Sequence, residues 1–275
     1  MIILKSLDEF LEWRAEIGEQ TLGLVPTMGA LHDGHLSLVE ASLQKSDVTL
    51  AYIFVNPAQF AAHEDLDTYP QTLDADIEKL KTTGCDALWI PSAEDIYPGG
   101  DMSSDIEPAS VAYPLEGEHR PHFFKGVVNV LSRFFDHVKP DFVFMGEKDY
   151  QQLLVVQHMV KEYEIDIEII GVPTVRDDNG LALSSRNAYL NESEYDVAIH
   201  LNRILFVMAE KIRSGQDVKI VKADALVDLQ NAGFDKIDYC AIRDAHNLQH
   251  ATHGSLRILA AVIIGQTRLI DNVPV

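Results

Sequence analysis

Two histidines, His32 and His35, lie three residues apart where an apolar run gives way to a helical pattern. Residues 22–26 are typical of a short buried strand, and apolar side chains recur at helical spacing from residue 36 to residue 43. The first turn of a helix has unpaired N–H groups and the positive end of the helix dipole, and both attract anions. The sequence therefore predicts a phosphate-binding turn at this junction, with the two imidazoles as additional donors.

Two other interpretations of the histidine pair are open. Zinc binding is the weaker one, because zinc usually requires further Cys, His or carboxylate ligands at matching short spacing, and none follows His35. Either histidine alone could instead cap the helix or lie buried in the core. The neighbouring Gly29 and Gly34 favour ligand binding, because a glycine lets a ligand approach the backbone closely.

A second donor segment contains Lys148, which follows the apolar run 142–145 by three residues. In an open α/β sheet this position lies at the carboxyl edge of the strands, where ligands bind. A surface lysine paired with Glu147 or Asp149 explains the segment equally well when it is taken alone. Asp149 itself suits either a hydrogen bond to a ribose or the N-cap of the next helix.

A third donor segment contains Ser184, Ser185 and Arg186, and it follows a turn at residues 177–180. Two hydroxyls and a guanidinium in a row suit a loop that holds phosphate oxygens, with the arginine as a bidentate donor. Serines are common in ordinary turns, so this segment indicates little by itself. The combination of three such segments in one chain favours phosphate binding.

The chain carries 22 Lys and Arg against 43 Asp and Glu, which leaves a formal charge of −21. A field of that sign repels polyanions and argues against general binding to nucleic acid or to an anionic membrane. Any phosphate site in this chain must therefore be local, and the three donor segments are where we expect it.

The composition favours a globular enzyme of the cytoplasm. A chain of 275 residues can bury roughly three quarters of its unfolded surface, and this one has no uninterrupted apolar run of membrane-spanning length. Its first apolar run gives way to Lys5, too early for a secretory signal. Cys85 and Cys240 form no CxxC pattern, so we expect two reduced thiols in the core.

Strand and helix patterns alternate along the first part of the chain, which predicts a mostly parallel sheet covered by helices. Predicted strands are residues 22–26, 49–55, 87–90, 142–145 and 167–171, and predicted helices are 73–82, 126–138 and 152–163, with an irregular stretch at 92–122. Helices near 193–214 and 217–232 then precede β-like runs at 237–242 and 256–264. We therefore expect a Rossmann-like nucleotide-binding domain over residues 1–174 and a smaller, lid-like α+β domain over residues 175–275.

The donor residues also belong to longer motifs. These are residues 25–35, 53–60, 144–153, 171–176 and 180–187, with 268–272 closing the set. On these motifs the sequence resembles the pantoate–beta-alanine ligase family, of the HxGH nucleotidyltransferase superfamily, over nearly its whole length. The HxGH motif alone indicates the superfamily, whereas the ordered set is specific to the family.

The resemblance implies an ATP-dependent ligation in two steps. The carboxylate of pantoate attacks the α-phosphorus of ATP to give pantoyl adenylate and pyrophosphate, and the amine of β-alanine then displaces AMP to form pantothenate. Fixed donors would stabilise the charge that concentrates on the phosphate oxygens. Magnesium is expected to bridge the phosphates of ATP and to be held mostly by water, and the resemblance implies a homodimer.

The resemblance also implies roles for individual residues. His35 takes the position of the proton donor. Gln59 and Gln152 bind pantoate within the domain of residues 1–174, where a neutral amide orients a carboxylate without neutralising it. The residues matched to phosphate-contacting, catalytic groups are His32, Lys148, Ser184, Ser185 and Arg186. The full set implied to bind ATP is Met28, Gly29, Ala30, Leu31, His32, Asp33, Gly34, His35, Gly146, Glu147, Lys148, Asp149, Val175, Leu183, Ser184, Ser185 and Arg186.

Some positions are less certain matches. We nominate Asp76 as a protein ligand of magnesium, although an exposed acid on a helix is the simpler interpretation of that position. The chain departs from the family pattern at Gln71, where an arginine is usual, at Ala58, where a methionine is usual, and at His122, which is displaced by one position.

Two other functions are compatible with parts of the sequence. A nucleotidyltransferase would keep the nucleotide on its product, and Gln59 and Gln152 argue against it because they match a pantoate site. A catalytically silent nucleotide-binding module would need few of the donors, so the intact histidines, Lys148 and residues 184–186 argue against that alternative.

Overall fold

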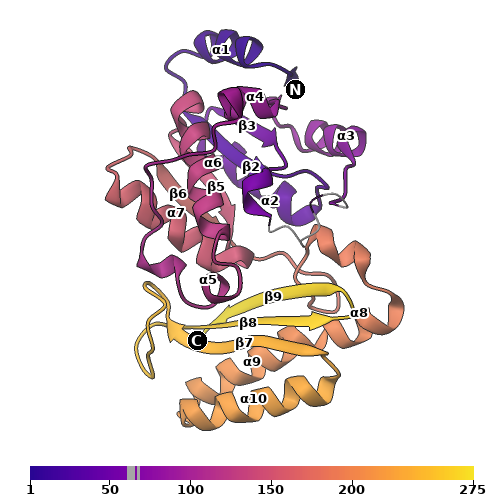
Figure 1. Cartoon of the computed structure of the whole chain (residues 1–275). Helices are drawn as coiled ribbons and strands as arrows, with labels where there is room; N and C mark the ends of the chain where they lie inside the picture. Colours follow the sequence, from indigo (N-terminus) through magenta and orange to yellow (C-terminus); the bar gives the residue numbers. More distant parts are fainter. Residues whose placement is uncertain (61–65, 67–68) are drawn as a thin grey trace. The chain divides into compact units, whose positions relative to one another are not determined.

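The computed structural model describes residues 1–60, 66 and 69–275 (Figure 1). The chain divides into two compact units, one formed by Met1–Glu147 with Val155–Pro173 and the other by Lys148–Leu154 with Thr174–Val275. The lid-like role expected of residues 175–275 stays a prediction.

The first unit is built on a six-stranded sheet whose order is β1-β4-β3-β2-β5-β6, and every pairing is parallel. The strands are β1 Ile2–Leu4, β2 Leu22–Thr27, β3 Val48–Ile53, β4 Ala87–Trp89, β5 Phe142–Gly146 and β6 Glu168–Val172. The helices of this part of the chain are α1 Leu7–Glu16, α2 Asp33–Lys45, α3 Leu73–Thr83, α4 Ala93–Ile96, α5 Glu116–His119, α6 Phe123–Val138 and α7 Tyr150–Glu162. This architecture confirms the predicted α/β fold class.

Helices cover both faces of the sheet because successive strand residues point in opposite directions. On β3, Ala51 packs in one cluster with Leu38 and Leu80, from α2 and α3. The next residue, Tyr52, stacks on Phe134 of α6, with ring centroids 3.6 Å apart. Strands buried on both faces need continuous apolar runs, which is the pattern of β2 and β3.

Gly23 allows α2 to approach the sheet closely. A Cβ atom on Gly23 would lie 2.1 Å from Ser42 Oγ and 2.3 Å from Ser46 Oγ. A larger side chain there would displace both serine hydroxyls, so the close contact between β2 and the C-terminal end of α2 is made possible by this glycine. That contact sets the distance of α2 from the sheet.

The strand order predicts that a ligand binds beyond the carboxyl ends of the neighbouring strands β2 and β5. Along the chain, β2, β3 and β4 proceed to one side, whereas β5 and β6 lie on the other side of β2. Ligands of open α/β sheets bind beyond the carboxyl ends of the strands at such a reversal. The segments that leave β2, β3 and β5 at that edge carry the histidine pair, Gln59 and Glu147.

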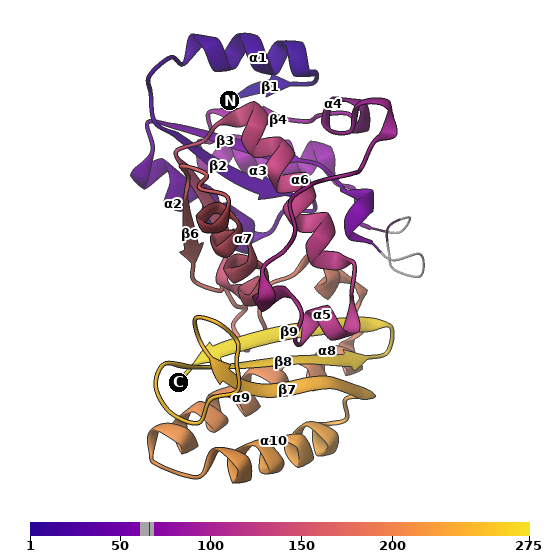
Figure 2. The same cartoon turned by 60° about the vertical axis from the view of Figure 1, so that its left-hand side comes forward.

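The second unit contains a three-stranded antiparallel sheet of order β7-β8-β9 (Figure 2). Its elements are α8 Glu192–Ala198, α9 His200–Arg213, α10 Val218–Ala232, β7 Lys236–Asp244, β8 Leu256–Ile264 and β9 Thr267–Pro274. Figures 1 and 2 show α9 and α10 on one face of this sheet. Their apolar sides share a core with it that includes Leu205, Leu229 and Ile258.

Some elements were not predicted from the sequence. The pattern-based prediction omits β1, α1 and β9, and it treats α8 and α9 as one helix, although the chain breaks at Ile199. Within residues 92–122 the structure has the four-residue helices α4 and α5 and single 3₁₀ turns. Elements this short leave too few residues for a period to be detected.

The two cysteines are core residues, as predicted. Cys85 and Cys240 are free thiols and both are buried. Burial raises the pKa of Cys85 to about 11 and that of Cys240 to about 12, so both thiols stay protonated and unreactive near neutral pH. Among the residues that the structure describes, no helix combines the length and apolar character needed to cross a membrane.

Candidate active site

The histidine pair forms the N-terminal cap of α2. His32 is the N-cap residue, and its Nδ1 accepts a hydrogen bond from Gly34 N at 3.1 Å. His35 Nδ1 in turn accepts from His32 N at 3.3 Å, and the two ring centroids are 4.1 Å apart. The pair therefore makes a reciprocal capping box with imidazoles in place of the usual hydroxyl and carboxylate.

This capping geometry sets the protonation pattern of the two rings. A ring nitrogen that accepts a backbone N–H carries no proton, so the neutral form of each imidazole holds its proton on Nε2. Each ring then uses Nδ1 for the helix, and Nε2–H is its other hydrogen-bonding group. Helix capping and anion binding are thus compatible roles of the same two side chains.

The turn that precedes α2 is held by a buried carboxylate. Asp76, in the first turn of α3, is 1% exposed. Its Oδ2 accepts from Ala30 N at 2.9 Å, and its Oδ1 accepts from Leu31 N at 2.8 Å. The interpretation of Asp76 as an exposed acid is therefore wrong.

The same geometry engages most of the lone pairs with which Asp76 could bind magnesium. Backbone N–H groups point at both carboxylate oxygens, and a third donor, Thr72 Oγ1, lies 3.1 Å from Oδ1. Within residues 1–60, 66 and 69–275 no three His, Cys, Asp or Glu side chains gather as a metal site. The described residues thus form no cluster of protein ligands for magnesium, and ligation of magnesium by Asp76 stays a prediction.

Gln59 lies in a 3₁₀ turn, Pro57–Gln59, that a buried amide organises. Asn56 is 1% exposed, and its Oδ1 accepts from Ala58 N at 3.2 Å and from Tyr97 Oη at 2.8 Å. Gly126 packs against this turn so closely that a Cβ there would lie 2.3 Å from Ala58 O. The backbone that carries Gln59 is therefore fixed, and the side chain is half-buried rather than a loop amide in water.

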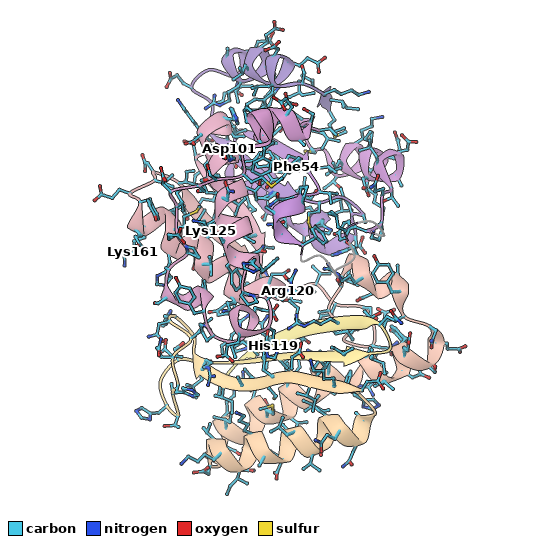
Figure 3. All side chains as sticks on the ribbon, viewed as in Figure 1. Phe54, Asp101, His119, Arg120, Lys125 and Lys161 are labelled. Atoms are coloured by element: carbon cyan, nitrogen blue, oxygen red, sulfur yellow. The ribbon has the colours of Figure 1, made fainter. Side chains whose placement is uncertain are left out.

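Arg120 contacts the same turn from the segment after α5. Arg120 is labelled in Figure 3. Its Nη2 donates to Gln59 O at 3.3 Å, and its guanidinium lies 3.9 Å from the centroid of the Phe123 ring. A cation in this place increases the number of donors near the carboxyl edge of the first unit. The sequence patterns did not single out Arg120.

In the second unit, β9 positions the segment that carries Lys148. Asn272 Nδ2 donates to Lys148 O at 2.9 Å, while Asn272 Oδ1 accepts from Arg257 Nε at 2.7 Å. Arg257 also lies over the ring of Tyr150, 3.9 Å from its centroid. Lys148 Nζ is 3.8 Å from Asp149 Oδ2, so the paired-lysine interpretation also describes a real contact.

The segment from Val175 to Arg186 is held by its own turn and by β9. Leu183 N donates to Val175 O at 3.0 Å, and Ser184 Oγ caps the 3₁₀ turn by accepting from Arg186 N at 3.3 Å. Arg176 makes a bidentate ion pair with Asp271 at 2.7 and 2.8 Å. This pair ties the beginning of the segment to the second-unit sheet.

The predicted site residues divide between the units. In the first unit, residues 28–35, Gln59 and the Gly146–Glu147 pair follow neighbouring parallel strands at one edge. The second unit holds Lys148, Asp149, Gln152, Val175 and Leu183–Arg186. The buried anchors Asn56, Asp271 and Asn272 were not predicted as site residues, although the motif at 268–272 contains two of them.

Three departures from the family pattern lie in the first unit. Gln71 and His122 are exposed, and His122 precedes α6 without capping it through its side chain. Ala58 contributes its backbone to the turn before Gln59. Gln71 and His122 therefore lie at the surface, whereas Ala58 belongs to the turn that carries Gln59.

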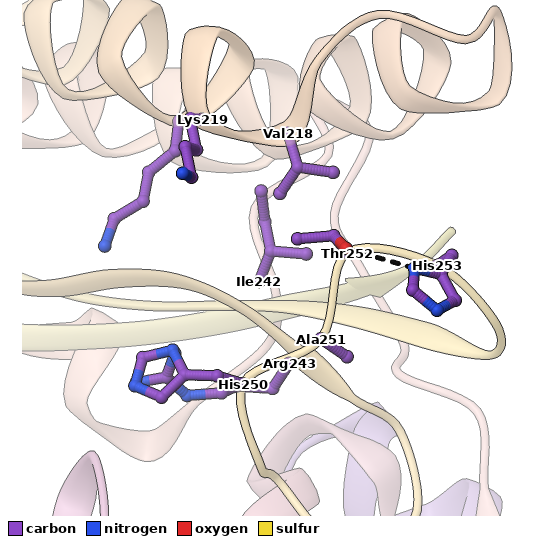
Figure 4. Close-up of a pocket in the computed structure, with 9 residues that line it drawn as sticks. Val218, Lys219, Ile242, Arg243, His250, Ala251, Thr252 and His253 are labelled. Carbon is purple, nitrogen blue, oxygen red and sulfur yellow. Dashed lines mark hydrogen bonds between the residues drawn. The ribbon is translucent and has the colours of Figure 1, made fainter.

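A cavity of about 470 Å³ lies elsewhere in the second unit (Figure 4). Its lining comes from the start of α10, the end of β7 and the following loop, including Lys219, Arg243 and His250. None of the residues that the sequence predicts for the site lines it. This cavity is therefore not part of the candidate active site, whose residues lie on the turns and segments described above.

A capped helix N-terminus at the reversal point of a parallel sheet is the place where α/β proteins of the nucleotide-binding class hold their ligands. Comparison with known families specifies it further. The family model described as pantoate-beta-alanine ligase matches residues 2–274. The chain belongs to this family.

Individual relatives agree over full length. The chain is 44% identical to a pantothenate synthetase of Caulobacter vibrioides, covering 100% of this chain and 98% of the relative, and 47% identical to one of Azotobacter vinelandii, covering 100% and 99%. A pantothenate synthetase structure from Thermus thermophilus matches with a TM-score of 0.94 at 37% identity, covering 99% of each chain. A Francisella tularensis pantoate-beta-alanine ligase structure, complexed with beta-gamma ATP and β-alanine, matches with a TM-score of 0.83 at 35% identity, covering 100% and 97%.

The Arg176–Asp271 pair should be a stability element of the second unit. Asp271 is 2% exposed in its side chain and Arg176 is 18% exposed, so Arg176→Met leaves a buried carboxylate without its cation. We expect a loss of about 3 kcal/mol in the free energy of unfolding, measured by urea denaturation. As a control, Arg213→Met removes an exposed pair with Glu210 and should cost about 1 kcal/mol or less; equal losses in the two variants would contradict the role of burial.

Proposed function

We propose that this protein condenses pantoate with β-alanine at the expense of ATP, through a pantoyl adenylate, and releases AMP and pyrophosphate. The observation that supports this most strongly is the histidine-capped N-terminus of α2 at the sheet edge. It occurs in a chain that the pantoate-beta-alanine ligase model matches over residues 2–274.

In the first step, a carboxylate oxygen of pantoate forms a bond to the α-phosphorus of ATP. The bond from that phosphorus to the bridging oxygen breaks, and its electron pair leaves with pyrophosphate. The N-terminus of α2 and the Nε2–H groups of His32 and His35 donate to phosphate oxygens as charge accumulates on them. Because the capping bonds hold both rings before ATP arrives, little reorganisation is needed during the reaction.

In the second step, the amine of β-alanine attacks the carbonyl carbon of the adenylate. The bond from that carbon to the phosphate oxygen breaks, AMP leaves with the electron pair, and the new amide nitrogen loses its extra proton. Donors on the phosphate also favour this step, because they stabilise AMP as the leaving group.

The remaining roles follow the family resemblance. Lys148, Ser184, Ser185 and Arg186 contact phosphate, with the arginine as a bidentate donor. Gln59 and Gln152 orient pantoate by neutral amide hydrogen bonds. The nucleotide contacts proposed in addition are Met28–Leu31, Asp33, Gly34, Gly146, Glu147, Asp149, Val175 and Leu183.

Three further expectations remain proposals. Magnesium would accompany ATP, held by phosphate oxygens and water. The protein would act as a homodimer, which light scattering coupled to size-exclusion chromatography can test. Its place of action would be the cytoplasm.

AMP release distinguishes this reaction from nucleotidyl transfer. With ATP and pantoate present, we expect sustained AMP formation only after β-alanine is added, because the amine is what displaces AMP. An enzyme that keeps the nucleotide on its product would instead release pyrophosphate without AMP, and a silent module would release neither. Chromatography of the nucleotides with and without β-alanine makes this measurement.

Removing the donor histidine should affect catalysis far more than stability. We expect His35→Ala to lower kcat by about 10²- to 10³-fold, which corresponds to roughly 3 to 4 kcal/mol for one preorganised donor. The loss of its cap bond should cost only about 1 kcal/mol of stability. Turnover and thermal melting are measured on the same preparations.

The matched control is Ser6→Ala, which removes the N-cap side chain of α1 without touching a predicted site residue. It should lose a similar amount of stability and keep its activity. If His35→Ala lost activity only in proportion to unfolding, the proposed donor role would be wrong.

A further inference from the structure

We propose that Asp76 is a positioning residue for the phosphate-binding turn. Its carboxylate holds the backbone of Ala30 and Leu31 and thereby sets where α2 begins, with His32 as the N-cap and His35 in the first turn. This inference rests on the proposed function, and it assigns Asp76 a role that differs from metal ligation.

The turn at Gly29 and Ala30 adopts a backbone conformation that is unfavourable without contacts from the rest of the protein. Gly29 has φ +85° and Ala30 has φ +51°, so two consecutive residues are left-handed. This region costs a non-glycine residue roughly 1 to 2 kcal/mol. An ideal Cβ on Gly29 would also lie 3.2 Å from Ile53 Cγ2 and 3.3 Å from Asp76 Oδ2. Outside contacts must therefore stabilise the turn.

Helix α3 supplies those contacts through one acidic and one basic side chain. The Asp76 carboxylate accepts from the N–H groups of Ala30 and Leu31, at 2.9 and 2.8 Å. One turn further along α3, Lys79 Nζ donates to Leu31 O. Leu31 thus has its N–H and its C=O held by one helix, although that helix is more than forty residues away in sequence.

The residue before α3 supports the carboxylate. Thr72 is the N-cap of α3, yet its side chain makes no cap bond with the helix. Its hydroxyl lies 3.1 Å from Asp76 Oδ1 instead. The carboxylate therefore accepts from three donors while buried, which restricts its position.

Only an ionised carboxylate fits this set of donors. An asparagine has one acceptor oxygen, and its amide N–H groups would face Ala30 N or Leu31 N. Consecutive N–H groups in a left-handed turn form a concavity that binds anions, and here the protein's own carboxylate occupies it. In the proposed function, the phosphates of ATP then depend on the donors that follow in the chain, chiefly the Nε2–H groups of His32 and His35.

The negative charge of Asp76 and its positioning role affect the binding of ATP in opposite directions. A negative charge beside the turn repels phosphate, so its removal alone would strengthen ATP binding. Loss of the anchor would let the turn relax and would weaken ATP binding. The sign of the change in Asp76→Asn therefore separates the two effects.

The test compares steady-state kinetics of Asp76→Asn and wild type. We expect kcat/KM for ATP to fall by about 10- to 100-fold, as for a misplacement near 1 Å, while KM for β-alanine changes little. The matched control is Asp141→Asn, whose carboxylate accepts from Leu22 N at the opposite end of β2, at 2.7 Å. It should leave the kinetics with ATP unchanged. Tighter or unchanged ATP binding in Asp76→Asn, or an equal ATP defect in Asp141→Asn, would overturn the proposal.

Two further measurements test the proposal if Asp76→Asn does not fold or if the wild-type protein shows no activity. Thr72→Val removes one donor to Asp76 and should lower kcat/KM for ATP, but less than Asp76→Asn does. This variant tests the positioning role if Asp76→Asn does not fold. Hydrogen exchange without substrates should show faster exchange of the Ala30 and Leu31 amides in either variant than in wild type, and unchanged exchange would contradict the inference. Because this measurement needs no turnover, it still applies if wild type releases no AMP, a result that would count against the proposed function alone.

Discussion

The N-terminus of α2 has backbone N–H groups without a partner in the helix, and two imidazole rings accept those of His32 and Gly34. The rest of the site depends on this cap. It determines which ring nitrogens carry protons, and it keeps the helix N-terminus ordered where the sheet reverses its strand order. A serine or aspartate would cap the helix as well, but neither carries a second ring nitrogen that can donate a hydrogen bond.

A common device holds the other turns. Each segment that carries predicted donors is tied down by a buried polar side chain, which comes from the same turn for Gln59 and from the distant strand β9 for the other two segments. Asn56 organises the turn of Gln59, Asn272 holds the carbonyl of Lys148, and Asp271 pairs with Arg176 before the serine segment. In a chain with formal charge −21, affinity for phosphate must come from such local order, because the overall field opposes it.

The sequence allowed the parts with strong local signals to be predicted. Apolar runs and helical spacing identified β2 to β6 and most helices, and the donor motifs pointed to the loops at the ends of β2 and β5. It did not reveal β9, where Arg268, Asp271 and Asn272 interrupt the apolar pattern because their side chains bond within the unit. Nor did it reveal what Asp76 does, since a side chain's partners across many residues depend on the packing of α3 and not on local spacing.

The central claim is that the α2 terminus is ordered in advance to receive the phosphates of a nucleotide. Calorimetric titration with ATP and with AMP, in the absence of pantoate and β-alanine, tests it most directly. The account predicts measurable heat with ATP and much weaker binding of AMP, which lacks the outer phosphates. No heat at millimolar ATP, or equal affinities for the two nucleotides, would contradict it.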